Sequence, residues 1–342
     1  MKNKLNFLII GTGSMGKVYA NLVKNNFLCS LIAVVGNSKK KTKDFAHDFK
    51  IKGYDKGKMQ QAIDENSEIN CVIICTPEWV RLEPFEIAIN NKLNILYEKP
   101  LASNYVEALQ IFGLIKEKCS KKIVMPVQNL RFIPQLYSMK EKIENNEIGK
   151  IRHIVSRRNG NNSLIKRIIN NISPFFWLSP HEIDLMIWMS GSSVEYVESI
   201  EANYSQNDGY ILSNLKMKNN IDINHMSSWC TPPLNNYAPS STFEIFGTGG
   251  LLVYNENNTT GIHFKNNEII ELTDINYLPR IQGMIVGPFK LLFEHFIHCI
   301  INNLQPVISP RQSLEVIKVC EAMKISSETG NRIYCNDIKK KL

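Results

Sequence analysis

Short apolar runs alternate with amphipathic stretches through the first 128 residues of the chain. The amphipathic stretches repeat apolar residues every three or four positions, which is the spacing of a helix with one buried face. The apolar runs are typical of strands that are covered on both faces. They lie at residues 5–10, 31–35, 70–75, 95–97 and 122–128, with helical stretches after residue 14 and at residues 82–92 and 105–119. Strands that alternate with helices in this way predict a doubly wound parallel sheet of the α/β class.

Beyond residue 126 the pattern changes to longer runs that are rich in β-branched and aromatic residues. Strands are predicted at residues 194–204, 209–217, 221–229, 242–246 and 251–254, with helices at 288–302 and 312–329. The glycine-rich turn at residues 247–250 predicts that the last two strands form a hairpin. A chain of 342 residues is long enough for two domains. We therefore predict a Rossmann domain at residues 1–125 and an α+β domain at residues 126–342. The second domain should contain a large, mostly antiparallel, open-faced sheet, and its last helices should pack back on the first domain.

A glycine-rich loop follows the first predicted strand directly and opens the first predicted helix. It reads Gly11-Thr12-Gly13-Ser14-Met15-Gly16. In this context the first glycine allows a tight turn, the second lets the backbone approach a pyrophosphate, and the third allows close packing of helix and strand. The free N–H groups of the helix would hold the phosphates. The loop predicts a dinucleotide site.

The residues after the second predicted strand bear on which dinucleotide binds. An NAD site usually has an acidic residue here, which binds the ribose 2′-hydroxyl. This chain has Gly36, Asn37 and Ser38, followed by Lys39 and two further lysines. An amide, a hydroxyl and three ammonium groups suit a 2′-phosphate. The turn favours NADP(H) and leaves NAD(H) possible, while lysines on a solvated helix start would look the same.

Lys99 lies at the end of the strand that carries Ile95, Leu96 and Tyr97, and Pro100 follows it. In open α/β sheets the chemistry takes place just beyond the carboxyl ends of the strands. A single lysine after a strand is more often a solvated loop charge. Its neighbours in sequence and the other motifs of the chain make Lys99 a candidate for chemistry.

Composition and charge narrow the class of protein. The net charge of +8 comes from scattered lysines and favours small anionic ligands over nucleic acid. The eight cysteines form no CxxC pair and no cluster with metal-ligand spacing, so we expect a reducing compartment and no metal. The first apolar run is too short for a signal peptide, and no run approaches the length of a membrane span. We expect a cytoplasmic protein that binds neither nucleic acid nor membrane.

Four motifs of the first half occur together in one known family. They are GTGSMG near the start, CTP at the end of the run at residues 70–75, EKPLA after the run at 95–97 and VQNLRFIP at the end of the run at 122–128. With them the chain resembles the glucose–fructose oxidoreductase/inositol dehydrogenase (Gfo/Idh/MocA) family. In the second half His181-Glu182-Ile183-Asp184 is similar to the HxxD helix of that family. Helical spacing places His181 and Asp184 one turn apart.

The resemblance implies hydride transfer between a nicotinamide and a hydroxyl or keto carbon of a sugar, polyol or nucleotide-sugar. Lys99 would polarise that oxygen, and His181 would be the general acid or base, a role that suits a side chain titrating near neutral pH. The resemblance also implies that the cofactor contacts beyond the two turns described above are Cys75, Thr76, Pro77, Arg81, Glu98, Lys99 and Gln128.

The sequence departs from the family at two positions. Where the family commonly has an Asp four residues before the His, this chain has Trp177, which can stack on a sugar ring but is no carboxylate. Where the family often has a His after the TP pair, this chain has Arg81, which adds a fixed positive charge.

Several basic residues of the second half bear on the substrate. Arginines bind phosphates through paired N–H groups, so a cationic cleft with Trp177 would suit a phosphorylated or nucleotide-linked sugar. A solvated loop would account for the same arginines. Together with Lys99, Trp177 and His181, the expected substrate contacts are Arg131, Arg158 and Asp184, with Arg157 and Lys166 near the cleft mouth.

Two other interpretations stay open at this point. The first is a dinucleotide-binding sensor that has lost its chemistry, which Trp177 in place of the family Asp suggests. The second is an enzyme whose cofactor is reduced and reoxidised within one cycle. An open-faced sheet would leave one face to cover, so we also expect a homodimer or homotetramer.

Overall fold

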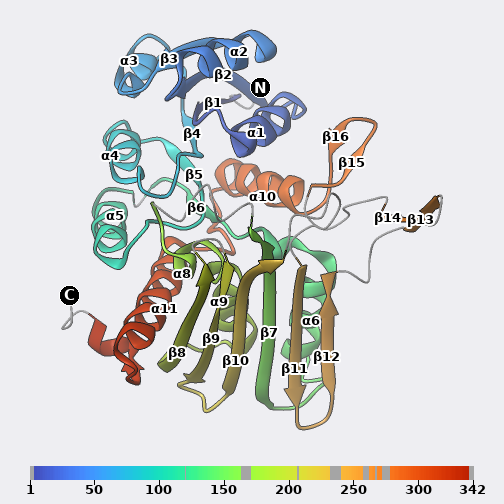
Figure 1. Cartoon of the computed structure of the whole chain (residues 1–342). Helices are drawn as coiled ribbons and strands as arrows, with labels where there is room; N and C mark the ends of the chain where they lie inside the picture. Colours follow the sequence, from blue (N-terminus) through green and yellow to red (C-terminus); the bar gives the residue numbers. More distant parts are fainter. Residues whose placement is uncertain are drawn as a thin grey trace. The chain divides into compact units, whose positions relative to one another are not determined.

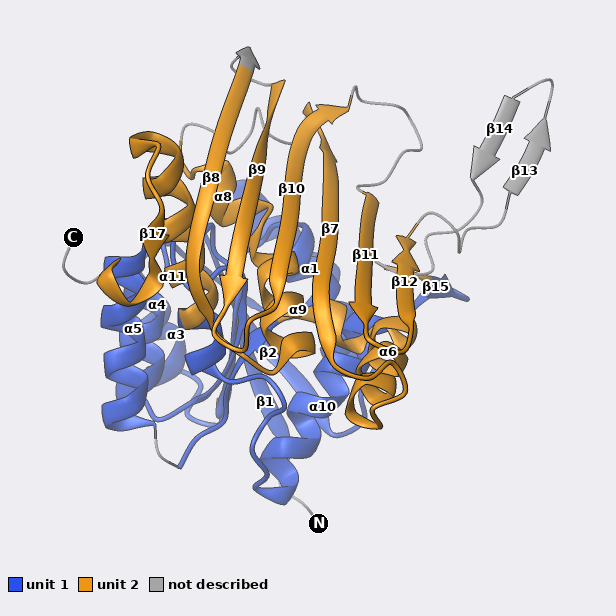
Figure 2. Ribbon diagram, turned by 90° about the horizontal axis from the view of Figure 1, so that it is seen from below, with its two compact units in different colours: residues 1–127, 280–314 blue, residues 128–279, 315–342 orange. Residues whose placement is uncertain are grey.

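The computed structural model describes residues 4–119, 121–162, 171–205, 208–231, 240–256, 262–265, 268–271 and 278–338. The chain forms two compact units (Figure 2). The first combines residues 1–127 with residues 280–314, and the second combines residues 128–279 with residues 315–342. The polypeptide thus returns to its first unit after building most of the second.

A six-stranded parallel sheet forms the centre of the first unit, in the order β3-β2-β1-β4-β5-β6 (Figure 1). Its central strands are buried almost throughout, as the apolar runs predicted. The predicted Rossmann fold is confirmed. The strands are β1 Leu5–Ile10, β2 Cys29–Gly36, β3 Lys52–Asp55, β4 Cys71–Ile74, β5 Asn94–Glu98 and β6 Val124–Val127.

The helices of the first unit come from both ends of the chain. From the late segment, α10 (Pro288–Asn302) packs its aromatic residues on early elements: the ring centroids of Phe293 and Phe7 lie 5.7 Å apart, and those of Phe289 and Tyr19 6.3 Å apart. The hairpin of β15 Arg280–Ile281 and β16 Met284–Ile285 precedes α10. The other helices are α1 Ser14–Lys24, α2 Lys39–Phe49, α3 Met59–Asp64, α4 Leu82–Asn90 and α5 Tyr105–Lys118.

The strand β3 and the helix α3 had no clear counterpart in the apolar pattern. Of the four residues of β3, only Tyr54 is buried, because β3 is the edge strand of the sheet. An edge strand with polar residues gives no apolar run. The six residues of α3 are too few to give a clear helical period.

A seven-stranded mixed sheet organises the second unit, in the order β12-β11-β7-β10-β9-β8-β17. Neighbouring strands are antiparallel except for the parallel pair β7 and β10. The predicted large, mostly antiparallel sheet is confirmed. Its strands are β7 Ile151–Asn161, β8 Val194–Ser205, β9 Asp208–Met217, β10 Asp222–Thr231, β11 Ser240–Gly247, β12 Leu251–Asn255 and β17 Ile333–Tyr334. A separate two-stranded sheet pairs β13 Ile262–Lys265 with β14 Glu268–Glu271.

Helices of the second unit cover one face of this sheet (Figure 2). Side chains that point to this face are buried, among them Ile154 of β7 and Ile223 of β10. On the opposite face Ile200 is 57% exposed and Leu212 is 38% exposed. The helical segments are η1 Asn129–Phe132, α6 Pro134–Glu144, α8 Pro174–Trp177, α9 Pro180–Ser190, residues 315–329 of α11 (Pro310–Thr329) and η3 Cys335–Asp337.

Candidate active site

The carboxyl ends of the parallel strands form one edge of the first sheet. Ile10 pairs with Val35 and with Ile74, and Glu98 pairs with Val127, so the strands end nearly level. The residues that follow these ends carry most of the predicted cofactor contacts: Gly11, Asn37, Cys75, Lys99 and the buried Gln128. This edge is where open α/β sheets bind their ligands.

The glycine loop at this edge has the shape that a pyrophosphate requires. Gly11 has a φ of +118°, and a Cβ there would lie 2.6 Å from the carbonyl oxygen of Cys75. A Cβ at Gly16 would overlap the carbonyl oxygen of Gly11. A Cβ at Gly13 would point into open space, and Gly13 caps α1 without a side chain. The first N–H groups of α1 can therefore face an anion, so the loop fits a dinucleotide.

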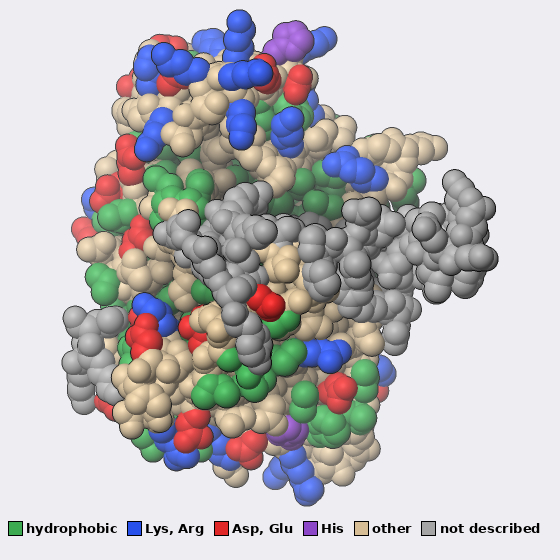
Figure 3. Space-filling model, in the orientation of Figure 1, with side chains coloured by type: hydrophobic (Ala, Val, Ile, Leu, Met, Phe, Trp, Pro, Cys, Tyr) green, Lys and Arg blue, Asp and Glu red, His purple; other side chains and the backbone are tan. Residues whose placement is uncertain are grey.

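At Gly36, the last residue of β2, the structure leaves no room for an acidic side chain. A Cβ at Gly36 would overlap the hydroxyl of Thr42 and lie 2.7 Å from the methyl carbon of Thr12. Ser38 caps α2, and its Oγ accepts a hydrogen bond from the backbone N–H of Lys41 at 3.4 Å. Lys39 is exposed in the first turn of α2. Figure 3 shows Lys and Arg side chains gathered over the part of the first unit that contains α2.

The loop after β4 buries the arginine that replaces the family histidine. The hydroxyl of Thr76 donates to the carbonyl oxygen of Val80 at 2.8 Å, which closes a turn that begins with the half-buried Thr76 and the exposed Pro77. Arg81 is 1% exposed, and its Nη1 donates to the carbonyl oxygen of Ile74 at 3.2 Å. Burial lowers the pKa of Arg81, while Glu78 and Glu98 oppose that change.

Glu98 and Lys99 lie side by side at the end of β5, in different surroundings. Glu98 is buried and accepts a hydrogen bond from the hydroxyl of Tyr19 at 2.8 Å. Burial raises the pKa of Glu98, against the lowering effects of the Tyr19 hydrogen bond and of the charges on Lys99 and Arg81. Lys99 is half-buried, and its peptide bond to Pro100 is cis. The carboxylate is thus held inside, and Lys99 follows it directly at the carboxyl edge of the sheet.

In the second unit, the segment that contains α8 and α9 offers two accessible side chains. From residue 174 to residue 186 only Trp177 and His181 are not buried. They are four residues apart, which places them on one side of a nearly continuous helical segment. The position that lost the family carboxylate therefore presents an indole next to His181.

Asp184 and Arg131, both predicted as substrate contacts, bind each other. The guanidinium of Arg131 donates to the two carboxylate oxygens of Asp184 at 2.6 and 2.7 Å. Both side chains are 2% exposed, and the guanidinium carbon lies 5.4 Å from the centre of the Trp188 ring. Asp184 therefore points into the unit, whereas His181, one turn earlier, stays accessible.

Arg158 is engaged in the same way. Its Nε donates to both carboxylate oxygens of Glu182 at 2.7 and 2.8 Å, and Ser241 donates to the same carboxylate at 3.2 Å. Burial disfavours the guanidinium charge, but Glu182 outweighs this effect and raises the pKa of Arg158. Glu182 was not predicted as the partner of Arg158, because no local pattern of the sequence connects it with β7.

The other two basic residues near the expected cleft mouth are less informative. Arg157 is exposed, since alternate residues of β7 point to opposite faces of the sheet. Lys166 lies outside the described residues.

A buried histidine lies among serines on the helix-covered face of the second sheet. His225 Nδ1 lies 2.8 Å from the hydroxyl of Ser156, and its Nε2 lies 3.0 Å from that of Ser227. Ser227 in turn lies 3.2 Å from Ser179, the residue that precedes α9. Burial lowers the pKa of His225 to about 4, so the ring is neutral at pH 7.

The lowered pKa of His225 predicts how the free energy of unfolding depends on pH. In the unfolded chain His225 takes a proton near its ordinary pKa of 6.5, whereas the folded protein resists protonation down to about pH 4. The free energy of unfolding therefore has its full value with respect to this group above about pH 6.5. It falls by about 3 kcal/mol as the pH drops to about 4. Chemical unfolding of wild type and His225→Gln from pH 7 to pH 4 measures it. The variant should lose this part of the pH dependence, and His47→Gln, at a side chain that is 90% exposed, should keep it.

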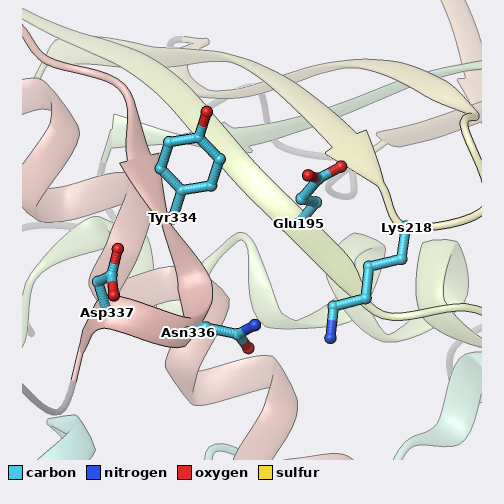
Figure 4. A pocket seen from close by; sticks show the side chains of 5 residues that line it. All are labelled: Glu195, Lys218, Tyr334, Asn336 and Asp337. Atoms are coloured by element: carbon cyan, nitrogen blue, oxygen red, sulfur yellow. The ribbon is translucent and has the colours of Figure 1, made fainter.

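A polar cavity of about 420 Å³ lies at the other end of the second sheet from Arg158 (Figure 4). In Figure 4 the ammonium of Lys218 and the amide of Asn336 point toward each other, while Tyr334 and Asp337 lie on the far side. Glu195 completes the lining. None of the predicted cofactor or substrate contacts lines this cavity.

Family models match both halves of the chain. Residues 5–125 match the Gfo/Idh/MocA oxidoreductase model with its NAD-binding Rossmann fold, and residues 137–253 match a Gfo/Idh/MocA C-terminal domain model. The chain belongs to the Gfo/Idh/MocA family. The resemblance read from the four motifs is confirmed, and the first unit is an NAD-binding Rossmann fold of an oxidoreductase family.

Curated relatives are distant and align over part of their length. The chain is 29% identical over 201 residues to Oxidoreductase P35 of Formosa agariphila, which covers 54% of this chain and 60% of that protein. It is 24% identical over 251 residues to glucose-6-phosphate 3-dehydrogenase of Bacillus subtilis. This alignment covers 66% of this chain and 68% of that protein.

Solved structures match nearly the whole chain. GenD2 from gentamicin A biosynthesis in complex with NAD has a TM-score of 0.84 at 17% identity, covering 97% of this chain and 96% of its own. Scyllo-inositol dehydrogenase of Lactobacillus casei with NAD(H) and scyllo-inositol has a TM-score of 0.79 at 17% identity, covering 97% and 99%. At this level of identity the likeness establishes the fold.

None of the described helices combines the length and the apolar character that a bilayer crossing requires. Within the same residues, no group of three or more His, Cys, Asp or Glu side chains could hold a metal ion.

Proposed function

We propose that the protein transfers a hydride between a nicotinamide dinucleotide and a hydroxyl-bearing carbon of a sugar or polyol. The observation that carries the proposal is Lys99 at the carboxyl edge of a Rossmann sheet whose glycine loop fits a pyrophosphate. A half-buried ammonium at this edge suits the polarisation of a hydroxyl or keto oxygen. Membership of an oxidoreductase family with an NAD-binding fold supports the same conclusion.

The chain's own side chains supply the acid/base chemistry. When bound, the cofactor supplies the hydride acceptor or donor. In the oxidation direction, Lys99 donates a hydrogen bond to the substrate oxygen and stabilises the negative charge that develops there. His181 accepts the hydroxyl proton, and in reduction it returns that proton. Trp177, one helical turn from His181, provides an apolar surface against which a sugar ring stacks.

The charges of the second unit favour an uncharged substrate over a phosphorylated or nucleotide-linked one. Arg131 and Arg158 are the buried arginines that were expected to bind a phosphate, and each is neutralised by a buried carboxylate. A phosphate there would lie close to the two carboxylates that already neutralise these charges, and like charges repel each other strongly where water is excluded. We therefore infer a neutral sugar or polyol.

We further propose that NADP(H) is preferred over NAD(H). An acidic side chain has no room at Gly36, and exposed lysines open α2. Losing one charged contact to the 2′-phosphate should weaken binding about ten- to a hundredfold. The double variant Lys39→Gln/Lys40→Gln should show this loss for NADP(H) and little change for NAD(H), measured by titration. Lys43→Gln, exposed further along the same helix, is the control. Equal losses for both cofactors would contradict the preference.

We also propose that a second copy of the chain covers the open face of the second sheet. This face exposes Ile200 and Leu212, and apolar side chains on a broad sheet are typical of an interface between identical subunits. Light scattering of the purified protein tests the dimer or tetramer.

All eight cysteines are free, which supports a reducing compartment such as the cytoplasm.

Nicotinamide absorbance tests the proposed activity. Purified protein is incubated with NADP or NAD, in both redox states, and with a panel of free sugars, polyols, sugar phosphates and nucleotide-sugars together with their keto forms. A change of absorbance that requires one uncharged substrate is the expected result. A response only to phosphorylated substrates would contradict the inferred substrate class.

Trp177 in place of the family Asp keeps the sensor as a second candidate. If the protein binds cofactor tightly but changes no absorbance across the panel, the sensor is supported, or a cycle in which the cofactor is reduced and reoxidised. Analysis of the reaction mixture for altered sugars separates these two outcomes.

A further inference from the structure

Arg81 is a buried charge with an unusually small number of partners. The side chain carries five N–H donors. The structure gives it one hydrogen bond, from Nη1 to the carbonyl oxygen of Ile74 at 3.2 Å. Its Nε is buried and has no acceptor among the described residues. The residue is 1% exposed, and no carboxylate of the described residues forms a salt bridge with it. A guanidinium held in this way costs stability, so a functional reason is to be expected.

The position of Arg81 relates it to one half of the dinucleotide. The strand order β3-β2-β1-β4-β5-β6 reverses between β1 and β4, and a dinucleotide binds across such a switch point. The adenosine ribose lies at the end of β2 in the proposed function, so the nicotinamide half belongs to the ends of β4 to β6. Arg81 is bound to Ile74, the last residue of β4.

We propose that Arg81 makes the protein bind the reduced cofactor more tightly than the oxidised one. This inference rests on the proposed function. The oxidised nicotinamide ring carries a positive charge, and the reduced ring carries none. A fixed positive charge in a poorly solvated place repels the oxidised ring alone. Histidine, the family residue at this position, would be neutral near pH 7 and would not exert this repulsion.

The charged groups around Arg81 leave its effect only partly compensated. Glu78 and Glu98 are the carboxylates whose charges act on it most, and Lys99 adds a second positive charge beside Glu98. Burial raises the pKa of Glu98, which reduces its capacity to neutralise the guanidinium. Glu78 is only half-buried, so water screens its charge.

Cofactor titrations test the proposal without any substrate. NADP⁺ and NADPH are titrated into wild type, Arg81→Gln and Glu78→Gln, and the ratio of the oxidised to the reduced Kd is compared. Arg81→Gln should lower this ratio about tenfold, which corresponds to the loss of about 1.4 kcal/mol of charge repulsion. Glu78→Gln should raise the ratio, because it removes a compensating negative charge. Lys116→Gln, at an exposed site on α5, should leave the ratio unchanged.

The possible outcomes separate this inference from the proposed function. If Arg81 only supports the loop after β4, its variant weakens both redox forms equally, and an unchanged ratio overturns the inference. If Arg81→Gln does not fold, Glu78→Gln still tests the inference. A ratio that stays constant or falls in Glu78→Gln also overturns the inference. If wild type binds neither form, the proposed function fails, and the inference fails with it.

Discussion

Lys99→Met is expected to reduce turnover about a hundredfold to a thousandfold while leaving the Kd of the cofactor within about threefold of wild type. The ammonium is proposed to donate to the substrate oxygen and to stabilise the alkoxide, and removal of one such preorganised group costs about that much in rate. Methionine keeps the length of the side chain but has neither the charge nor the donors. Steady-state kinetics on the substrate found in the absorbance panel, together with cofactor titration, measure both quantities.

A matched control removes a lysine that has no proposed role. Lys118 is exposed in the last turn of α5, so Lys118→Met should change neither turnover nor cofactor binding. If Lys99→Met turns over as fast as wild type, the role assigned to Lys99 is wrong. If it loses cofactor affinity to the same extent as turnover, Lys99 acts in binding and not in chemistry.

Arg131→Met is expected to lower the free energy of unfolding by about 3–5 kcal/mol. The substitution leaves the carboxylate of Asp184 buried without its bidentate partner, and an uncompensated buried charge is costly. The loss also removes the guanidinium that packs on Trp188. Denaturant unfolding at pH 7 measures the change.

A double variant separates the charge from the packing. Arg131→Met combined with Asp184→Leu replaces the pair with apolar side chains, and exchanges of this kind are often close to neutral. The double variant should therefore recover most of the stability that the single variant loses. A double variant that is as unstable as Arg131→Met would mean that packing around the guanidinium, and not the unpaired carboxylate, accounts for the loss.

Because Asp184 lies in the helix that begins beside His181, the pair also positions the proposed acid/base. Glu182 binds Arg158 from the same helix, so two buried ion pairs hold α9. We expect Arg131→Met to lower activity through the orientation of His181, in addition to its effect on stability.

The local patterns of the sequence were sufficient for the first unit, apart from β3 and α3, and for much of the second. The run at residues 5–10, the loop from Gly11 to Gly16 and the helix after it form one continuous unit of sequence, and their chemistry is set by neighbours in the chain. The same holds for the hairpin of β11 and β12 and for the helix at residues 288–302. The spacing of Trp177 and His181 also determined that both lie on one side of their helical segment.

Only the tertiary structure decided which polar side chains bind each other. Arg131 and Asp184 are 53 residues apart, and Tyr19 and Glu98 are 79 residues apart. Periodicity tells which face a residue is on but not which partner lies opposite, so the sequence could offer Arg131, Arg158 and Asp184 as substrate contacts when the fold pairs them inside. The burial of Arg81 and the pairing of Arg158 with Glu182 have the same origin. They depend on packing between distant segments, and the free energy of this packing cannot be predicted from any local stretch of the sequence.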